Sequence, residues 1–295
     1  MKNCEKNFTK MFTTVFEDGH IVLKNNDGST KILDIGLEPL HFELNSKGNR
    51  FCVSYRIGED IMLREYETAV EKFYEHGKIK SEKSFSYSYD STYLIIGRDN
   101  TIDILKGRKP YYKKSDIEGY KSFCIGNKSN VIAILFDNFI YIYSIKTTAE
   151  LVKINSVDLL IDRIKFSSDD LLIAGLNSIN SRITIFNIRA NSRNYLIPTL
   201  VVKYDSPIDI IFSKVENTAV VCYRNSCIRV WNLVTHEVIV EEFTRDKIIG
   251  LYNGSNENNY IYIDECGRLT EIDILTNTVY NFESDVKYTR VKKIN

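Results

Sequence analysis

Residues that could carry chemistry are thinly spread along this sequence. The four histidines lie far apart, and none stands in the spacing of a catalytic or zinc-binding motif: His20, His41, His76 and His236. No G-x-S-x-G, H-E-x-x-H, Walker A or dinucleotide-binding glycine pattern occurs, so no motif places a nucleophile, a metal or a phosphate. We therefore expect a protein that is not an enzyme and that carries no metal or other cofactor.

The cysteines and the hydropathy pattern indicate a reducing compartment. The six cysteines are scattered, without C-x-x-C pairs or the density of a disulfide-rich domain: Cys4, Cys52, Cys124, Cys222, Cys227 and Cys266. No apolar run approaches the roughly 20 residues of a membrane span, and residues 1–6 lack the apolar core of a signal peptide. We expect buried free thiols in an intracellular protein, either cytoplasmic or nuclear.

Positive and negative charges balance, with 39 lysines and arginines against 39 aspartates and glutamates. No global field draws such a chain to nucleic acid or to an anionic membrane, so a partner of that kind has to meet a local patch. The most basic stretch surrounds Tyr111 and Tyr112 and contains five cations: Lys106, Arg108, Lys109, Lys113 and Lys114. Cations beside aromatic rings suit phosphates and stacked bases, whereas lysines also protect a strand edge from aggregation.

A second basic stretch runs from Lys287 to Lys293 and has the same two interpretations. If the two stretches lie together, they form a surface for RNA or for an acidic protein. If they lie apart, neither one indicates a partner.

The elements that position these residues follow a repeat. A short apolar-alternating box recurs about every 40 residues, in seven copies: Ile32–Ile35, Ile61–Glu65, Ile102–Leu105, Ile140–Ser144, Ile183–Asn187, Ile228–Asn232 and Leu269–Asp273. Dividing 295 residues by seven gives about 42 residues per unit, the length of a four-stranded propeller blade. The sequence predicts an all-β chain, a seven-bladed β-propeller of four-stranded antiparallel blades, with residues 1–295 in one domain.

The spacing of the boxes is uneven at the start of the chain. Only about 31 residues separate Leu33 from Arg64, too few for an outer strand before the next inner strand, so blade one is predicted to lack its outer strand. Residues 286–294 form a surplus strand-like tail. A propeller closes by pairing strands from its two ends or leaves an exposed edge, so we expect this tail or residues 2–10 to close the ring.

The repeat resembles the WD40 family. Trp231-Asn232 matches the family's Trp-Asp position, and Leu33-Asp34 and Ile272-Asp273 match its second half. The Gly-His pair, Gly19-His20, falls in a hairpin turn and not ahead of an inner strand. The resemblance implies a propeller that binds other proteins. We expect a non-catalytic interaction scaffold, monomeric by itself, within an intracellular protein or ribonucleoprotein assembly.

A second resemblance covers about residues 139–252 and is to the PROPPIN propellers, which bind phosphoinositides in autophagy. The matching segments are Ile140–Tyr143, Ser206–Ile208 and Ile228–Trp231. Phe243-Thr244-Arg245-Asp246 falls where that family has Phe-Arg-Arg-Gly, so only Arg245 matches the lipid-binding arginines. The resemblance implies, as the alternative function, lipid binding at an intracellular membrane through Arg245.

Partner-binding residues are expected at one end of the central channel. The turns between the second and third strands of the blades gather there and project Arg56, Arg98, Phe139 and Arg224. Arginine and aromatic side chains are enriched at protein-binding hot spots. Trp231, the single tryptophan, is predicted to be buried between blades, with its indole N–H bonded to Asn232 or to a backbone group.

Overall fold

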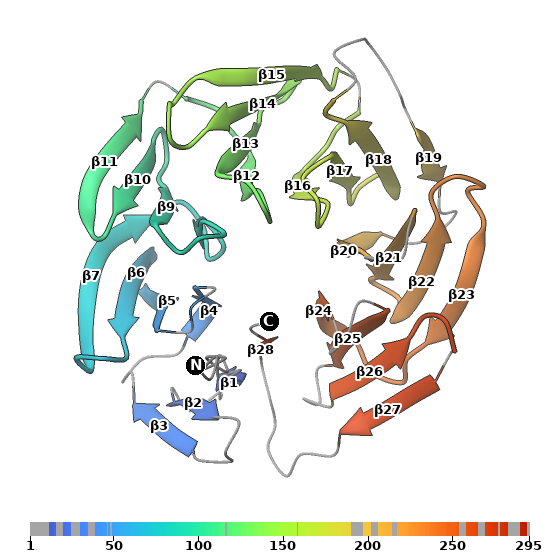
Figure 1. Cartoon of the computed structure of the whole chain (residues 1–295), viewed down its shortest axis with the longest axis horizontal. Coiled ribbons are helices and arrows are strands. Elements are labelled where there is room, and N and C mark those ends of the chain that lie inside the picture. The colour runs from blue at the N-terminus through green and yellow to red at the C-terminus, as the bar shows by residue number, and fades with distance from the viewer. Residues whose placement is uncertain are drawn as a thin grey trace, which may run out of the picture.

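The computed structural model describes residues 12–15, 20–24, 30–34, 39–45, 47, 49–115, 117–157, 159–189, 197–201, 206–213, 217–253, 258–264, 269–276, 278–282 and 290–293. Within these residues, antiparallel strands pair into seven four-stranded sheets, and the sheets stand in a ring around an open centre (Figure 1). Each sheet is one blade of a propeller.

Six of the blades follow chain order from the innermost to the outermost strand. They contain β4 (Pro39–Leu44), β5 (Arg50–Ile57), β6 (Asp60–Glu67) and β7 (Lys72–Ile79); β8 (Phe85–Tyr87), β9 (Tyr93–Gly97), β10 (Ile102–Lys106) and β11 (Lys109–Lys114); and β12 (Ser122–Ile125), β13 (Val131–Leu135), β14 (Phe139–Ser144) and β15 (Glu150–Asn155). The next three contain β16 (Arg163–Phe166), β17 (Leu172–Asn177), β18 (Arg182–Asn187) and β19 (Ile197–Val201); β20 (Pro207–Phe212), β21 (Thr218–Tyr223), β22 (Cys227–Asn232) and β23 (Val238–Phe243); and β24 (Ile248–Asn253), β25 (Asn259–Asp264), β26 (Leu269–Asp273) and β27 (Thr278–Phe282).

The remaining blade draws its strands from both ends of the chain, in the order β28 (Arg290–Lys293), β1 (Phe12–Val15), β2 (His20–Lys24) and β3 (Thr30–Asp34). β28 is its innermost strand, because β28 pairs with β1 and also contacts the innermost strands β4 and β24. Blade one therefore lacks an inner strand in chain order, and the prediction of a missing outer strand was wrong. The box at Ile32 lies on the outermost strand, and β4 begins only a few residues later. Residues 2–10 lie outside the described residues.

The hydrophobic core lies between neighbouring blades. Strands in the middle of a blade are buried on both faces, so β9 and β21 read as continuous buried runs, whereas outermost strands such as β15 alternate. Leu135 of β13, for example, packs in one apolar cluster with Phe166 of the next blade.

Trp231 belongs to this core, as predicted, and is 9% exposed. Its indole Nε1 donates to the hydroxyl of Tyr223 at 3.0 Å, so the predicted acceptors were wrong. The Asn232 side-chain oxygen accepts instead from the backbone N–H groups of Val234 and Thr235 in the following turn, at 2.8 and 3.0 Å.

Turns alternate between two faces of the ring, because neighbouring strands run in opposite directions. In the six blades that follow chain order, face 1 carries the turns between the first and second strands and between the third and fourth. Face 2 carries the turns between the second and third strands and the links from one blade to the next. In the described part of the chain, no helix is long and apolar enough to cross a lipid bilayer.

Candidate functional site

The predicted partner-binding residues divide into two pairs. Arg56, at the end of β5, and Arg224, in the turn after β21, are exposed on face 2. Phe139, at the start of β14, is half-buried, and the Lys153 ammonium lies 3.9 Å from the centre of its ring. The two exposed arginines are thus available to a partner, while Phe139 packs within its own blade.

Arg98 is committed to contacts between blades. Its Nε donates to Asp103 Oδ2 at 2.6 Å, and its Nη2 donates to the backbone carbonyl of His76 on β7 at 3.0 Å. Its Nη1 donates to the carbonyl of Lys78 on the same strand. Because three of its donors already have internal acceptors, Arg98 connects two blades and has little left to offer a partner.

Three exposed aliphatic side chains in two hydrogen-bonded segments of face 2 were not predicted from the sequence. Val157 and Leu160 lie in the link between β15 and β16 and are 43% and 54% exposed, and Ile179 lies in the turn between β17 and β18 and is 80% exposed. We call these three residues the Ile179 patch. An apolar residue inside a polar turn, as in Asn177-Ser178-Ile179-Asn180, is the sequence signal that could have revealed it.

Hydrogen bonds hold the two segments of the Ile179 patch in place. The Asn177 side-chain amide donates to the carbonyl of Leu159 at 2.8 Å, and its oxygen accepts from the backbone N–H of Ile179 at 3.0 Å. Asp162 Oδ2 accepts from the backbone N–H of Ser178 at 2.8 Å. Leu160 has a φ of 49°, a left-handed conformation that is unusual for a branched apolar residue. The backbone that carries the Ile179 patch is therefore fixed by hydrogen bonds and is strained at Leu160.

The basic stretch of the sequence forms an outermost strand. Lys109, Lys113 and Lys114 belong to β11, and Lys106 ends β10. Lys106, Lys109 and Lys113 are exposed, and none of these four lysines has an ion pair with another described residue. We call the four lysines the basic strip.

Arg108, in contrast, points into the protein. Its Nε donates to Glu65 Oε2 at 2.7 Å and its Nη2 to Glu67 Oε2 at 2.7 Å, and its guanidinium lies 3.6 Å from the centre of the Tyr74 ring. These contacts join the blade of β8–β11 to that of β4–β7. Arg108 is therefore part of an ion network between blades and does not belong to the basic strip.

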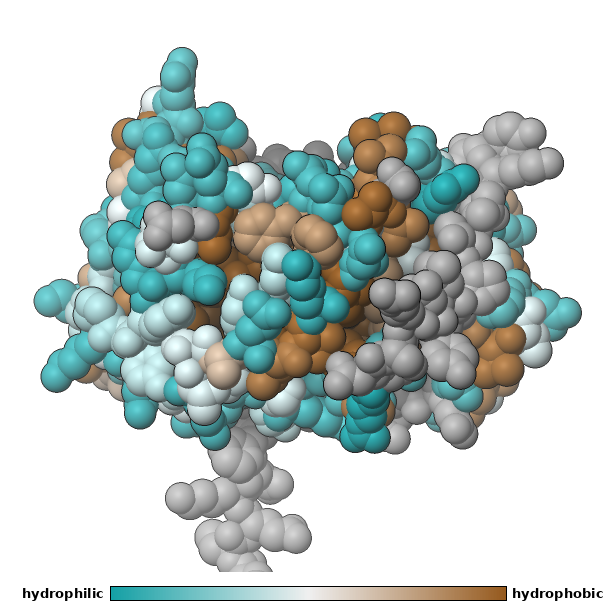
Figure 2. All heavy atoms as spheres, turned by 90° about the horizontal axis from the view of Figure 1, so that it is seen from above, coloured by the Kyte–Doolittle hydropathy of each residue, from teal (hydrophilic) through white to brown (hydrophobic). Residues whose placement is uncertain are grey.

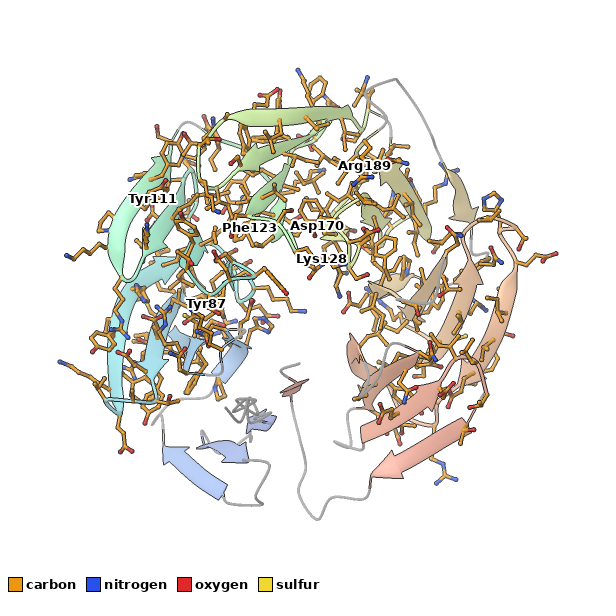
Figure 3. The ribbon with its side chains drawn as sticks, in the orientation of Figure 1. Tyr87, Tyr111, Phe123, Lys128, Asp170 and Arg189 are labelled. Carbon is orange, nitrogen blue, oxygen red and sulfur yellow. The ribbon has the colours of Figure 1, made fainter. Side chains whose placement is uncertain are left out.

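Glu65 is the centre of this network and is fully buried. Tyr87 donates its hydroxyl to Glu65 Oε1 at 2.8 Å (Figure 3) and Arg50 approaches the same oxygen at 3.4 Å, while His76 Nε2 lies 3.7 Å from Oε2. Burial alone would raise the pKa of the carboxyl, but the His76, Arg108 and Tyr87 contacts lower it from 4.5 to about 2. Arg108 and Tyr87 donate to the Glu65 carboxylate at 2.7 and 2.8 Å and so lie closer to it than His76, at 3.7 Å.

The other predicted positions lie apart from the basic strip. β28, in the second basic stretch, is an innermost strand, whereas β11 is outermost, so the two stretches do not form one surface; Lys287 lies outside the described residues. Arg245 is exposed in the link from β23 to β24, beside Asp246.

No group of three or more His, Cys, Asp or Glu side chains among the described residues is placed to hold a metal ion. Cys52, Cys124, Cys222 and Cys227 are free thiols, and burial raises the pKa of the Cys52 thiol well above its ordinary value. Cys4 and Cys266 lie outside the described residues.

Comparison with solved structures identifies the fold. The crystal structure of the C-terminal WD40 domain of Sif2 superposes with a TM-score of 0.65 at 12% identity, over 95% of this chain and 84% of that chain. The fold is that of the WD40 β-propellers. A functionally unknown protein from Desulfotomaculum acetoxidans DSM 771 has a TM-score of 0.69 at 13% identity, over 96% of this chain and 98% of that one. No protein-family model and no curated protein matches the chain.

Proposed function

We propose that this WD40-type propeller is a non-catalytic interaction scaffold, a subunit of an intracellular protein or ribonucleoprotein assembly, and that it binds a protein partner through face 2. The observation that carries the proposal is the Ile179 patch, in which three aliphatic side chains stand in solvent on hydrogen-bonded turns. Exposure of aliphatic side chains to water is unfavourable. Their burial by a partner stabilises a complex by about 25 cal/mol for each Å² of apolar surface removed from water.

The fixed turns also reduce the cost of binding. A flexible loop loses conformational entropy when a partner orders it, whereas the segments around Asn177 and Asp162 are already ordered by their own hydrogen bonds. Arg56 and Arg224 add exposed cations on the same face, and arginine is enriched at hot spots. The polar residues Ser178 and Asn180 flank Ile179 in its turn, and an apolar core with a polar rim is the usual composition of a protein interface.

The test replaces Ile179 with aspartate. We expect Ile179→Asp to leave the unfolding free energy within about 0.5 kcal/mol of wild type, because the side chain is mostly in solvent. Partners recovered with the wild-type chain by affinity purification and mass spectrometry should be depleted with this variant. The partner is then purified, and its Kd should rise by about tenfold or more with Ile179→Asp.

Val234→Asp is the matched control, because Val234 is a comparably exposed aliphatic residue in a turn on face 1. Equal Kd values for wild type and both variants would contradict the proposal. A flotation assay tests the lipid alternative separately: binding to phosphoinositide liposomes that is lost with Arg245→Ala would replace the scaffold function by membrane binding.

A further inference from the structure

We propose that the rim of the ring contains a second binding site, beyond face 2, for an extended acidic peptide segment of a partner protein that inserts the methyl end of one aliphatic side chain between two blades. The site joins the basic strip to an apolar slot. The slot lies between the blade of β8–β11 and the blade of β12–β15, and its lining residues are Ile102, Ile104, Tyr112, Lys114, Ile132, Ile134, Tyr143, Ser144 and Thr148.

The slot has a volume of about 20 Å³, so it suits the terminal methyl groups of an aliphatic side chain and not the whole side chain. Its walls are isoleucines and the rings of Tyr112 and Tyr143, and the Lys114 ammonium lies 4.6 Å from the centre of the Tyr143 ring. A hollow with apolar walls binds an apolar group more readily than it holds water, which needs polar partners. Figure 2 shows one side of the ring, on which hydrophobic areas lie recessed among hydrophilic side chains.

The charge around the slot favours an acidic ligand. Lys114 is part of both the slot and the basic strip. The exposed Lys146, in the turn between β14 and β15, lies across the blade boundary, where its carbonyl accepts from the Tyr111 hydroxyl. Two acidic residues stand near these cations. Glu150 is opposite Tyr143 in the register of β14 and β15, and Asp103 is opposite Lys113 in the register of β10 and β11 but pairs with Arg98. No described acidic residue pairs with the lysines of the basic strip, so their attraction for a partner's carboxylates is not cancelled internally.

The backbone of β11 favours an extended ligand. Within the described residues β11 pairs only with β10, so its outer edge carries backbone groups that another strand can bind. A peptide that adds to such an edge gains main-chain hydrogen bonds, and its alternate side chains reach the pockets of the sheet. Pro110 has no backbone N–H to donate, so residues 111–114 supply the remaining backbone donors and acceptors of this edge.

The two tyrosines are less suited to nucleic acid. Tyr111 (Figure 3) packs against Tyr93, with ring centres 5.2 Å apart, and donates its hydroxyl to the carbonyl of Lys146 at 2.7 Å. Tyr112 forms a wall of the slot. Tyr111 is 42% exposed, but Tyr112 is committed to the slot, so the strand does not offer two neighbouring free rings. Stacking of successive bases on aromatic rings is a main source of affinity for single-stranded RNA beyond charge.

The experiment measures the anisotropy of a fluorescein-labelled peptide in which aspartates and glutamates flank one central leucine. We expect the full-length protein to bind it, and Lys109→Glu combined with Lys113→Glu to raise the Kd by about tenfold or more through lost charge complementarity. Alanine in place of the peptide's leucine should also raise the Kd by about tenfold, because the slot loses its apolar occupant.

Lys83→Glu is the matched control, since Lys83 is exposed in the link between β7 and β8, away from the strip. It should leave the Kd unchanged, as should Ile179→Asp, which separates this site from face 2. Thermal melts verify that every variant is folded. Three results would overturn the inference: no binding of the peptide, equal binding of the leucine and alanine peptides, or tighter binding of a labelled uridine oligonucleotide of the same charge that displaces the peptide.

Discussion

Neighbouring cations in this chain have different roles because of what each side chain can reach. Arg108 follows Lys106 by two residues, yet its forked guanidinium reaches Glu65 and Glu67 together, while Lys106, Lys109 and Lys113 remain exposed. A planar group with several donors satisfies two carboxylates in a way that a single ammonium does not. These contacts lower the pKa of Glu65 and keep it ionised although its side chain is fully buried.

Glu65→Gln should destabilise the protein by about 3–5 kcal/mol, because Arg50 and Arg108 would lose the buried carboxylate they share and only Glu67 would remain to pair with Arg108. Urea denaturation at neutral pH measures this loss. The same network predicts a pH dependence. The folded pKa of Glu65 is about 2 against an ordinary value of 4.5, so its contribution is present above pH 4.5 and disappears as the pH falls toward 2.

Glu75→Gln provides the control for this prediction, since Glu75 pairs with Arg64 at 2.5 Å but is half-exposed, and the glutamine amide oxygen can still accept from the Tyr55 hydroxyl, which donates to Glu75 Oε2 at 2.7 Å. Removal of an exposed pair should cost less than about 1 kcal/mol. In the Glu65→Gln protein the free energy of unfolding should vary less between pH 5 and pH 2 than in wild type. An equal loss of unfolding free energy in both variants would show that the buried network stabilises the fold no more than an exposed ion pair does.

At the scale of elements, one turn depends on a residue of the next blade. Two blades close the turn after their first strand with a Ser-x-Asp pattern, in which the serine Oγ lies 2.7 Å from Asp90 Oδ1 in one and 2.6 Å from Asp169 Oδ1 in the other. The turn between β12 and β13 lacks the pattern. Its Lys128 and Ser129 instead donate their backbone N–H groups to Asp170 Oδ2, at 2.8 and 2.6 Å (Figure 3).

Asp170→Asn should therefore destabilise the turn between β12 and β13, although Asp170 belongs to the next blade. Asparagine tolerates the left-handed φ of 61° at this position but loses the negative charge that the N–H groups face. We expect a loss of about 1–3 kcal/mol and faster hydrogen exchange at Lys128 and Ser129. Asp169→Asn is the control, because Asp169 caps its own turn. Unchanged exchange at Lys128 and Ser129 in Asp170→Asn would refute the dependence.

The sequence predicts local features well and long-range partners poorly. The boxes at Ile61, Ile102 and Ile140 lie on the third strands of their blades, as expected, because strand alternation is a local property. The box at Ile32 lies on an outermost strand, because the inner strand of its blade comes from the far end of the chain. For the same reason Arg108 could be counted as a cation but its pairing with Glu65 could not be foreseen.

At the scale of the whole molecule, the blade formed by β28, β1, β2 and β3 determines how the ring closes. β28 pairs with β1 across four residues, from Phe12 opposite Lys293 to Val15 opposite Arg290, so the two ends of the described chain meet in one sheet. β28 also contacts β24 and β4, the innermost strands on either side. Its position is thus internal to the ring, where an absent strand leaves both an unpaired edge and a gap between neighbours.

Deletion of residues 286–295 should therefore lower the melting temperature or cause aggregation. The truncated chain would expose the inner edge of β1 and remove the contacts of β28 with β4 and β24, and each lost kcal/mol lowers the melting temperature of a domain of this size by roughly 2–4 °C. Deletion of residues 294–295 alone is the control, because it leaves β28 entire. Calorimetry and light scattering compare the three proteins. A melting temperature for the longer deletion that equals that of the control and of wild type would show that β28 is dispensable and that the ring is held closed without it.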